Sequence, residues 1–243
     1  MGVIVAYRPH IQASVTVVQP EFHFNRDQRR SHAADAIKSM DDVWGISDLL
    51  ASQHRDRDNM LFLLGINYGL RCGDLVSLRI GDVLDPHGNV RDSVILSEEK
   101  TGKYRTVYNN ATTENAILKY FAGKEVNLDD WLFRSESNHT SDDHLTRYSV
   151  ERILKKTINE EYGLPIHAST HCLRKTFGYQ TLMHAKDRSR GLELVQKLLN
   201  HSSPAVTMRY IGITDEELRD VYKADIFRRP MDFELSSGLR YLA

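Results

Sequence analysis

Cysteine is scarce in this 243-residue chain, which contains only Cys72 and Cys172. Their wide separation supports neither a disulfide framework nor a cysteine-based zinc site, so we expect two reduced thiols that pack as small apolar side chains. Long hydrophobic runs are also missing, because no stretch approaches the roughly 18 consecutive apolar residues of a membrane-spanning helix. Residues 1–20 lack the charged start and apolar core of a secretory signal. The sequence therefore predicts a cytoplasmic protein without a membrane partner.

An excess of basic charge is missing as well. The chain has 32 Lys and Arg against 33 Asp and Glu, for a formal net charge of −1. If such a chain binds nucleic acid, its basic residues must be gathered on one surface. The 11 histidines form no HExxH motif or comparable ligand spacing, so we expect no metal site.

The chain divides into three regions by its patterning. Residues 1–40 combine a β-like alternation with a polar run and are expected to form an extension or linker. Residues 41–227 carry the periodic apolar patterns of a folded domain, and residues 228–243 form a tail. At this length the domain is large enough to bury a substantial core.

Most of that domain reads as helix. Helical patterns cover a segment that begins near Ser39 or Asp41, a buried segment at 57–70 closed by Gly69, and residues 71–84 after a tight turn. The period then changes: "SVILS" at 93–97 and "YRTVY" at 104–108 favour a short antiparallel hairpin. Further amphipathic helices are expected at 112–124, 147–163, 171–185, 191–201 and 214–227. The predicted fold class is mainly α with a small antiparallel β-sheet.

Several basic residues stand where they could meet an anion. His171 and Arg174 are three residues apart, so on a helix they share a face, and a guanidinium offers paired donors that match phosphate oxygens. Arg71 follows Gly69 at an expected helix junction. Each of these residues taken alone is more often structural or solvated, so none identifies a site without the others.

Two further segments add reactive groups. Lys100 lies in the charged turn "EEKTGKYR" between the expected strands, where a lysine can reach a site as a proton donor; Lys103 and Arg105 compete with it on spacing. His201 and Tyr210 flank a Ser-Ser-Pro break. A tyrosine hydroxyl can form a covalent ester, but its ordinary pKa of about 10 requires cationic surroundings or a base.

Taken together, these residues indicate a functional site more strongly than any of them does alone. The segments "GLRCGDLVSLRIGDV", "EEKTGKYRTV", "HCLRKTF" and "LNHSSPAVTMRYI" contain an Arg, a Lys, a His-x-x-Arg, a His and a Tyr in that order. Over residues 41–227 the chain resembles the catalytic domain of the tyrosine recombinase (phage integrase) family. The resemblance implies six catalytic residues: Arg71, Lys100, His171, Arg174, His201 and Tyr210.

The resemblance also implies a mechanism and partners. Tyr210 attacks a backbone phosphate of double-stranded DNA to give a 3′-phosphotyrosyl intermediate, and a 5′-hydroxyl reverses the step. Because the bond energy stays in the covalent linkage, neither a cofactor nor a metal is implied. The expected assembly is a homo-tetramer on DNA, with accessory DNA-binding proteins, in the cytoplasm and at the nucleoid when bound.

The chain departs from the family pattern at three places and in length. Lys175 stands where histidine is common, Asn200 replaces a common glycine, and "VYNN" replaces a "VPL"-like run. Family members usually carry a separate DNA-binding domain ahead of the catalytic one, whereas only residues 1–40 precede it here. We favour a naturally small or truncated catalytic domain. A type IB topoisomerase-like enzyme and a catalytically silent DNA-binding regulator remain as alternatives.

Overall fold

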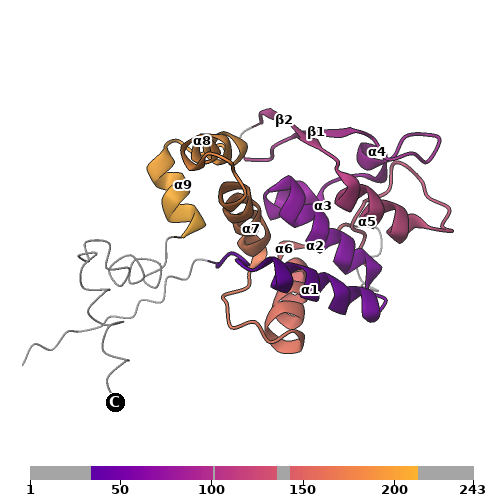
Figure 1. Ribbon diagram of the computed structural model, residues 1–243. Helices are drawn as coiled ribbons and strands as arrows, with labels where there is room; N and C mark the ends of the chain where they lie inside the picture. The colour runs from indigo at the N-terminus through magenta and orange to yellow at the C-terminus, as the bar shows by residue number, and fades with distance from the viewer. Residues whose placement is uncertain (1–33, 101, 136–142, 213–243) are drawn as a thin grey trace, which may run out of the picture. The chain divides into compact units, whose positions relative to one another are not determined.

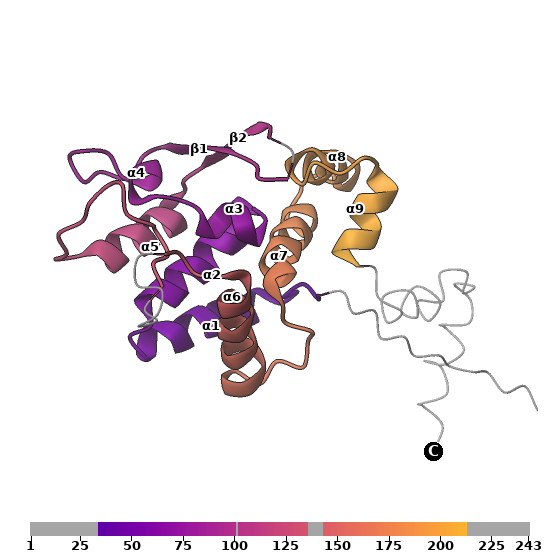
Figure 2. The same cartoon turned by 180° about the vertical axis from the view of Figure 1, so that it is seen from behind.

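The computed structural model describes residues 34–100, 102–135 and 143–212. In chain order the elements are α1 (Met40–Ser52), α2 (Asp56–Tyr68), α3 (Cys72–Val76), α4 (Ile80–Val83), β1 (Ser93–Ser97), β2 (Tyr104–Tyr108), α5 (Ala111–Phe121), α6 (Arg147–Leu154), η1 (Lys155–Glu161), α7 (Thr170–Met183), α8 (Arg188–Leu198) and α9 (Pro204–Ile211). Figures 1 and 2 show their arrangement from opposite sides. Most of the expected extension at 1–40, the helix expected at 214–227 and the tail at 228–243 lie outside the described residues.

The first two helices begin and end where the sequence indicates. The Ser39 hydroxyl caps α1 by accepting the backbone N–H groups of Asp41 and Asp42. Helix α2 ends at Gly69, which adopts a left-handed backbone with φ of 59°. Helix α2 is also buried on nearly every side, which explains its lack of a polar face. No helix of the described residues is long and apolar enough to cross a membrane.

The helix expected at 71–84 is instead two short helices, α3 and α4. The backbone between them pairs with a distant loop: Ile80 N–H donates to the Asp130 carbonyl at 2.9 Å, and Leu132 N–H donates to the Leu78 carbonyl at 2.8 Å. These bonds replace helical ones, so the predicted continuous helix was wrong at its centre. The apolar spacing is satisfied all the same, because Leu75, Leu78 and Val83 are all buried.

The segment expected as one helix at 147–163 changes from an α-helix to a π-helix part-way along. Helix α6 continues directly into the π-helix η1. The Thr157 hydroxyl in η1 accepts a hydrogen bond from Arg55 at 3.0 Å. This bond ties η1 to the start of α2.

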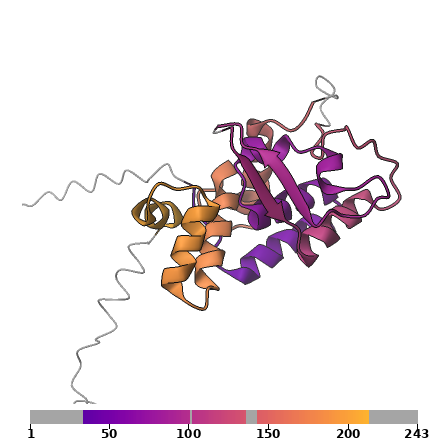
Figure 3. The same cartoon turned by 90° about the horizontal axis from the view of Figure 1, so that it is seen from above.

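The predicted hairpin is confirmed. Strands β1 and β2 pair antiparallel, with Val94 opposite Val107 and Ile95 opposite Thr106. Val94 and Val107 are buried against the helices, while Ile95 lies on the exposed outer face. Figure 3 shows both strands from above. The tip of the hairpin lies beside the end of α8, where both elements line a small cavity of about 250 Å³.

Helix α7 lies between two hydrophobic cores. On one side it packs against α2 and contributes Cys172 and Leu173 to the main core. On the other side it packs against α8 and α9 in a small second core built on Leu182, Val195, Leu199 and Ile211. Tyr210 belongs to this second core. The position of Tyr210 relative to α2 therefore depends on how α7 packs between the two cores.

The packing of α7 against α2 depends on a close approach of α7 to Gly69. A Cβ atom at Gly69 would overlap the Phe177 ring of α7. The Gly69 backbone is also left-handed, which favours glycine.

We therefore predict that Gly69→Ala lowers the free energy of unfolding by about 2–5 kcal/mol, combining backbone strain with overpacking. Gly88→Ala is the matched control, because Gly88 has a φ of 82° but nothing within 4 Å of an added Cβ. Urea denaturation of both variants checks this. Equal losses for the two would show that the approach of α7 to Gly69 contributes nothing.

Candidate active site

Five of the six predicted site residues come together from three parts of the chain. Arg71 lies at the start of α3, directly after the turn that ends α2. His171 and Arg174 lie on the first turns of α7. His201 follows α8, and Tyr210 lies in the last turn of α9.

Tyr210 is surrounded by basic side chains. Its hydroxyl lies 3.4 Å from Nδ1 of His171, within reach of a long hydrogen bond. The His201 ring meets the Tyr210 ring edge to face, with centroids 4.9 Å apart. Burial raises the pKa of Tyr210, although Arg174 and Arg71 oppose that change. The phenol is therefore protonated at neutral pH and needs a proton acceptor before it can attack.

Arg174 is buried and bridges two helix ends. One terminal nitrogen of its guanidinium donates to the Gly69 carbonyl at the end of α2, and the other donates to the Leu199 carbonyl at the end of α8, at 2.7 Å. Both carbonyls lie at the negative ends of helix dipoles, which suits a cation. Each terminal nitrogen carries a second N–H, so the side chain keeps donors for an anion.

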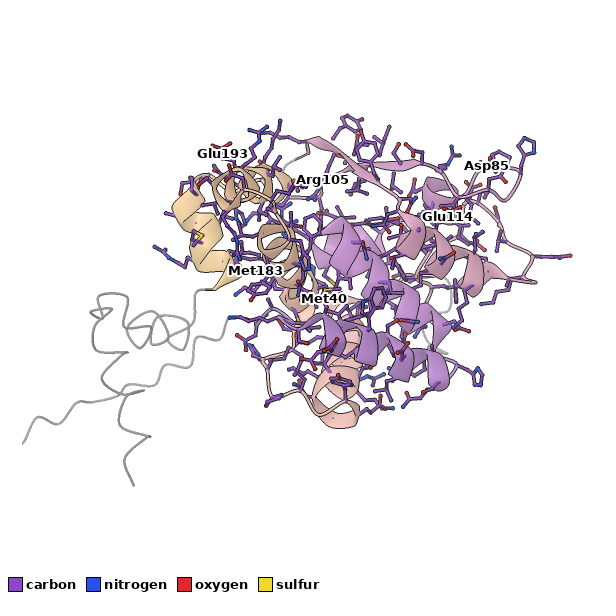
Figure 4. All side chains as sticks on the ribbon, in the orientation of Figure 1. Met40, Asp85, Arg105, Glu114, Met183 and Glu193 are labelled. Carbon is purple, nitrogen blue, oxygen red and sulfur yellow. The ribbon has the colours of Figure 1, made fainter. Side chains whose placement is uncertain are left out.

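Arg71 is held by buried carboxylates. Its guanidinium lies 2.9 Å from Glu98 and 3.8 Å from Asp74. Glu98 also lies 3.5 Å from Arg105, whose other terminal nitrogen donates to the Tyr68 carbonyl at 3.0 Å. Figure 4 shows Arg105 below the hairpin and toward α8. With Arg174, three guanidinium groups thus face two carboxylates, which leaves an excess of positive charge.

His201 is placed by the end of α8. Asn200 adopts a left-handed backbone with φ of 51°, the N–H of Asn200 donates to Lys197, and the N–H of His201 donates to Gln196. This is the Schellman pattern, in which glycine is the commonest residue at the left-handed position and asparagine is tolerated. The substitution of asparagine for glycine before His201 is thus compatible with the same turn.

Both histidines are kept neutral. Burial lowers the pKa of His171, and the neighbouring cations, with Arg174 first, lower it further. The pKa of His201 is lowered by the same causes, burial first and then Arg174 and Arg71. A neutral imidazole can accept a proton from Tyr210, which a protonated one cannot.

Lys100 stands apart from this cluster. It is exposed in the turn between β1 and β2, and no contact with another described residue joins it to the other five. Its competitor Arg105 is committed to Glu98 and Tyr68. The structure therefore does not bring Lys100 to the site, and its role stays a prediction.

Two residues of the site were missed from the sequence, and a third, Lys175, was noted there only as a departure from the family pattern. Asp74 and Glu98 are buried acids that hold Arg71, and Lys175 lies over the Tyr210 ring. Asp74 is one turn from Arg71, a spacing that could have indicated the pair. Glu98 gave no such signal, because it belongs to a charged turn whose partners are distant in sequence.

Comparison with known proteins identifies the family. A model described as "Phage integrase family" matches residues 39–217. The chain belongs to this family. The probable integrase/recombinase YoeC of Bacillus subtilis is 33% identical over 196 residues, which cover 79% of this chain and 97% of the relative. The phage integrase match thus includes all the described residues from 39 to 212.

Other members of the phage integrase family are longer. Tyrosine recombinase XerD of Corynebacterium glutamicum is 29% identical over 167 residues, covering 69% of this chain and 52% of XerD. The chain spans about half the length of the Xer recombinases that it matches. The shared part is the catalytic domain of a tyrosine recombinase.

Solved structures confirm the fold of this phage integrase family domain. The crystal structure of XerA recombinase has a TM-score of 0.58 at 23% identity, covering 84% of this chain and 67% of XerA. The structure of the Tn1549 transposon integrase in complex with transposon right end DNA has a TM-score of 0.52 at 13% identity, covering 82% and 67%. The predicted fold class, mainly α with a small antiparallel sheet, is confirmed.

The ion pairs of Glu98 yield a prediction. Replacing Glu98 by Gln leaves the partly buried Arg71 and Arg105 guanidinium groups without their shared carboxylate. We expect Glu98→Gln to lower the free energy of unfolding by about 3 kcal/mol, as measured by urea denaturation.

Glu99→Gln is the matched control for this variant. Glu99 is the next residue and pairs with Arg147 in solvent, where both side chains are mostly exposed. Its loss should cost less than about 1 kcal/mol. If Glu98→Gln were as stable as Glu99→Gln, the carboxylate would not be holding the two arginines.

The neutral histidines yield a pH prediction. The pKa of His171 is lowered below 6.5 in the folded protein, so the unfolded chain binds this proton at a higher pH than the folded one. Its contribution to stability is complete above pH 6.5 and is lost as pH falls through the lowered pKa. An NMR titration, with the His171 signal assigned through His171→Gln, should give a midpoint below 6.5. A midpoint at or above that value would contradict the assignment.

Proposed function

We propose that this protein is a site-specific DNA recombinase that cleaves and rejoins DNA strands through Tyr210. The observation that carries the proposal is the position of the Tyr210 hydroxyl, 3.4 Å from Nδ1 of His171 and beside Arg174. A partly buried phenol next to a neutral imidazole and fixed guanidinium groups is suited to attack on a phosphodiester. Family membership supports the same reaction.

The chemical step is a transesterification. The Tyr210 oxygen forms a bond to phosphorus, and the bond from phosphorus to the 5′-oxygen breaks, which leaves a 3′-phosphotyrosyl linkage and a free 5′-hydroxyl. The phenolic proton passes to His171, whose lowered pKa keeps it able to accept. Attack by a 5′-hydroxyl on the linkage reverses the step and joins the strands.

The arginines stabilise the charge of the transition state. Arg71 and Arg174 supply N–H donors to the nonbridging oxygens, and both are already fixed by protein contacts. Because their orientation is set before the DNA binds, little reorganisation accompanies the reaction. His201 donates to a nonbridging oxygen from its position against the Tyr210 ring.

Lys100 is assigned the proton for the leaving 5′-oxygen. It lies in the exposed turn of the hairpin, two residues after Glu98, which ties the start of that turn to Arg71. In this proposal, DNA brings the turn over the scissile phosphate. The lysine contributes only in the complex, in keeping with its separation from the cluster.

The proposed partner is double-stranded DNA. The Tn1549 integrase, which shares the fold, is described in complex with transposon DNA. With a net charge of −1, this chain has little overall attraction to phosphates, so we propose that affinity comes from the basic cluster, from assembly as a tetramer and from accessory DNA-binding proteins. Recombination of two duplexes requires such an assembly, since the joining strand comes from the other duplex.

We predict that Tyr210→Phe abolishes covalent attachment to a nicked suicide duplex while leaving DNA affinity nearly unchanged, because only the nucleophilic oxygen is removed. Denaturing gel electrophoresis measures the attachment, and a mobility shift measures the affinity. Tyr179→Phe is the control, since Tyr179 packs in the same second core without contacting His171. A denaturant-resistant complex formed by Tyr210→Phe would rule out this nucleophile.

A further inference from the structure

Lys175 is a buried lysine beside the Tyr210 ring. Its side chain is on α7, one turn after His171, and the residue is only 8% exposed. It forms no hydrogen bond or ion pair with any described residue. Burying an ammonium group without a partner is costly, so a lysine at this place needs an explanation.

The Lys175 ammonium faces the Tyr210 ring. Its Nζ lies 5.3 Å from the ring centroid, within the range of a cation–π contact. His171 approaches the hydroxyl of the same tyrosine, and His201 meets its ring edge to face. Because residues 171 and 175 are four apart on α7, both project toward α9.

We propose that Lys175 is a positioning residue for Tyr210: its charge holds the ring through the cation–π contact and stabilises the phenolate that develops as Tyr210 attacks. The inference rests on the proposed role of Tyr210 as nucleophile. It assigns a function to the position where this sequence departs from the common histidine of its family. A lysine keeps its charge at neutral pH more readily than an imidazole, so the contact is permanent rather than dependent on pH.

Other charged and titratable groups surround Lys175 and Tyr210 and come from each neighbouring element. They are Asp35 and Lys38 before α1, Arg71 before α3, Glu98 after β1, His171, Cys172 and Arg174 on α7, and His201 after α8. Burial lowers the pKa of Lys175, and Asp35 opposes this change. Asp35 accepts the His167 N–H at 2.8 Å and does not pair with the ammonium. The positive charge is therefore left facing the tyrosine.

The test compares Lys175→Met with Lys175→Arg in covalent attachment to a nicked suicide duplex across a pH range. The methionine keeps the length of the side chain and removes its charge, whereas the arginine keeps the charge. We expect Lys175→Met to attach about tenfold more slowly at pH 7 and to reach its plateau rate about one pH unit higher, since a nearby cation lowers the pKa of a phenol. Lys175→Arg should restore most of the rate.

Controls separate this inference from the proposed function and from misfolding. Lys186→Met removes the same charge from an exposed loop after α7 and should attach at the wild-type rate. Urea denaturation verifies that Lys175→Met is folded, and Lys175→Gln replaces it if it is not. Failure of the wild type to attach would overturn the role of Tyr210 itself.

If the wild type attaches and Lys175→Met matches it at every pH, the inference is wrong. It is equally wrong if Lys175→Arg is as slow as Lys175→Met, because the charge would then not be what acts. A merely structural lysine would change the denaturation midpoint without moving the pH profile.

Discussion

The guanidinium of Arg174 is the interaction on which the site depends. It donates to the Gly69 carbonyl at the end of α2, in the main core, and to the Leu199 carbonyl at the end of α8, in the second core. The same side chain lies beside Tyr210 and adds to burial in lowering the pKa of both histidines. One buried cation thus sets where the helices meet and what charge the neighbouring groups carry.

The acidic residues of the site offset the repulsion between its arginines. Guanidinium groups gathered for a phosphate repel one another when no phosphate is present. Glu98 and Asp74 hold Arg71 and Arg105 in place in the free protein. They are fewer than the cations, so the site keeps a net positive charge while the chain as a whole is slightly negative. This explains how a chain of formal net charge −1 can present a local anion site.

The sequence was informative where chemistry depends on local spacing. The pairing of His171 with Arg174 on a helix face, the end of α2 at Gly69 and the hairpin follow from periodicity and turn residues, and the family resemblance ordered the rest. Glu98 and Lys175 could not be found in this way, because their partners are brought near by tertiary packing alone. The break between α3 and α4 was missed for the same reason, since the bonds that cause it reach a loop about fifty residues away.

The second core has a consequence for how the nucleophile moves. Helix α9 has eight residues and packs in a second core of four buried apolar residues, one of which, Ile211, is its own, whereas α2 is enclosed by the main core. Segments with few buried contacts open at a smaller free energy than the global unfolding of a domain. Helix α9, which carries Tyr210, can therefore open locally while the arginines keep their contacts. Hydrogen exchange at the α9 amides should accordingly be faster than at those of α2. Mobility of the nucleophile is thus separated, within one domain, from rigidity of the anion site.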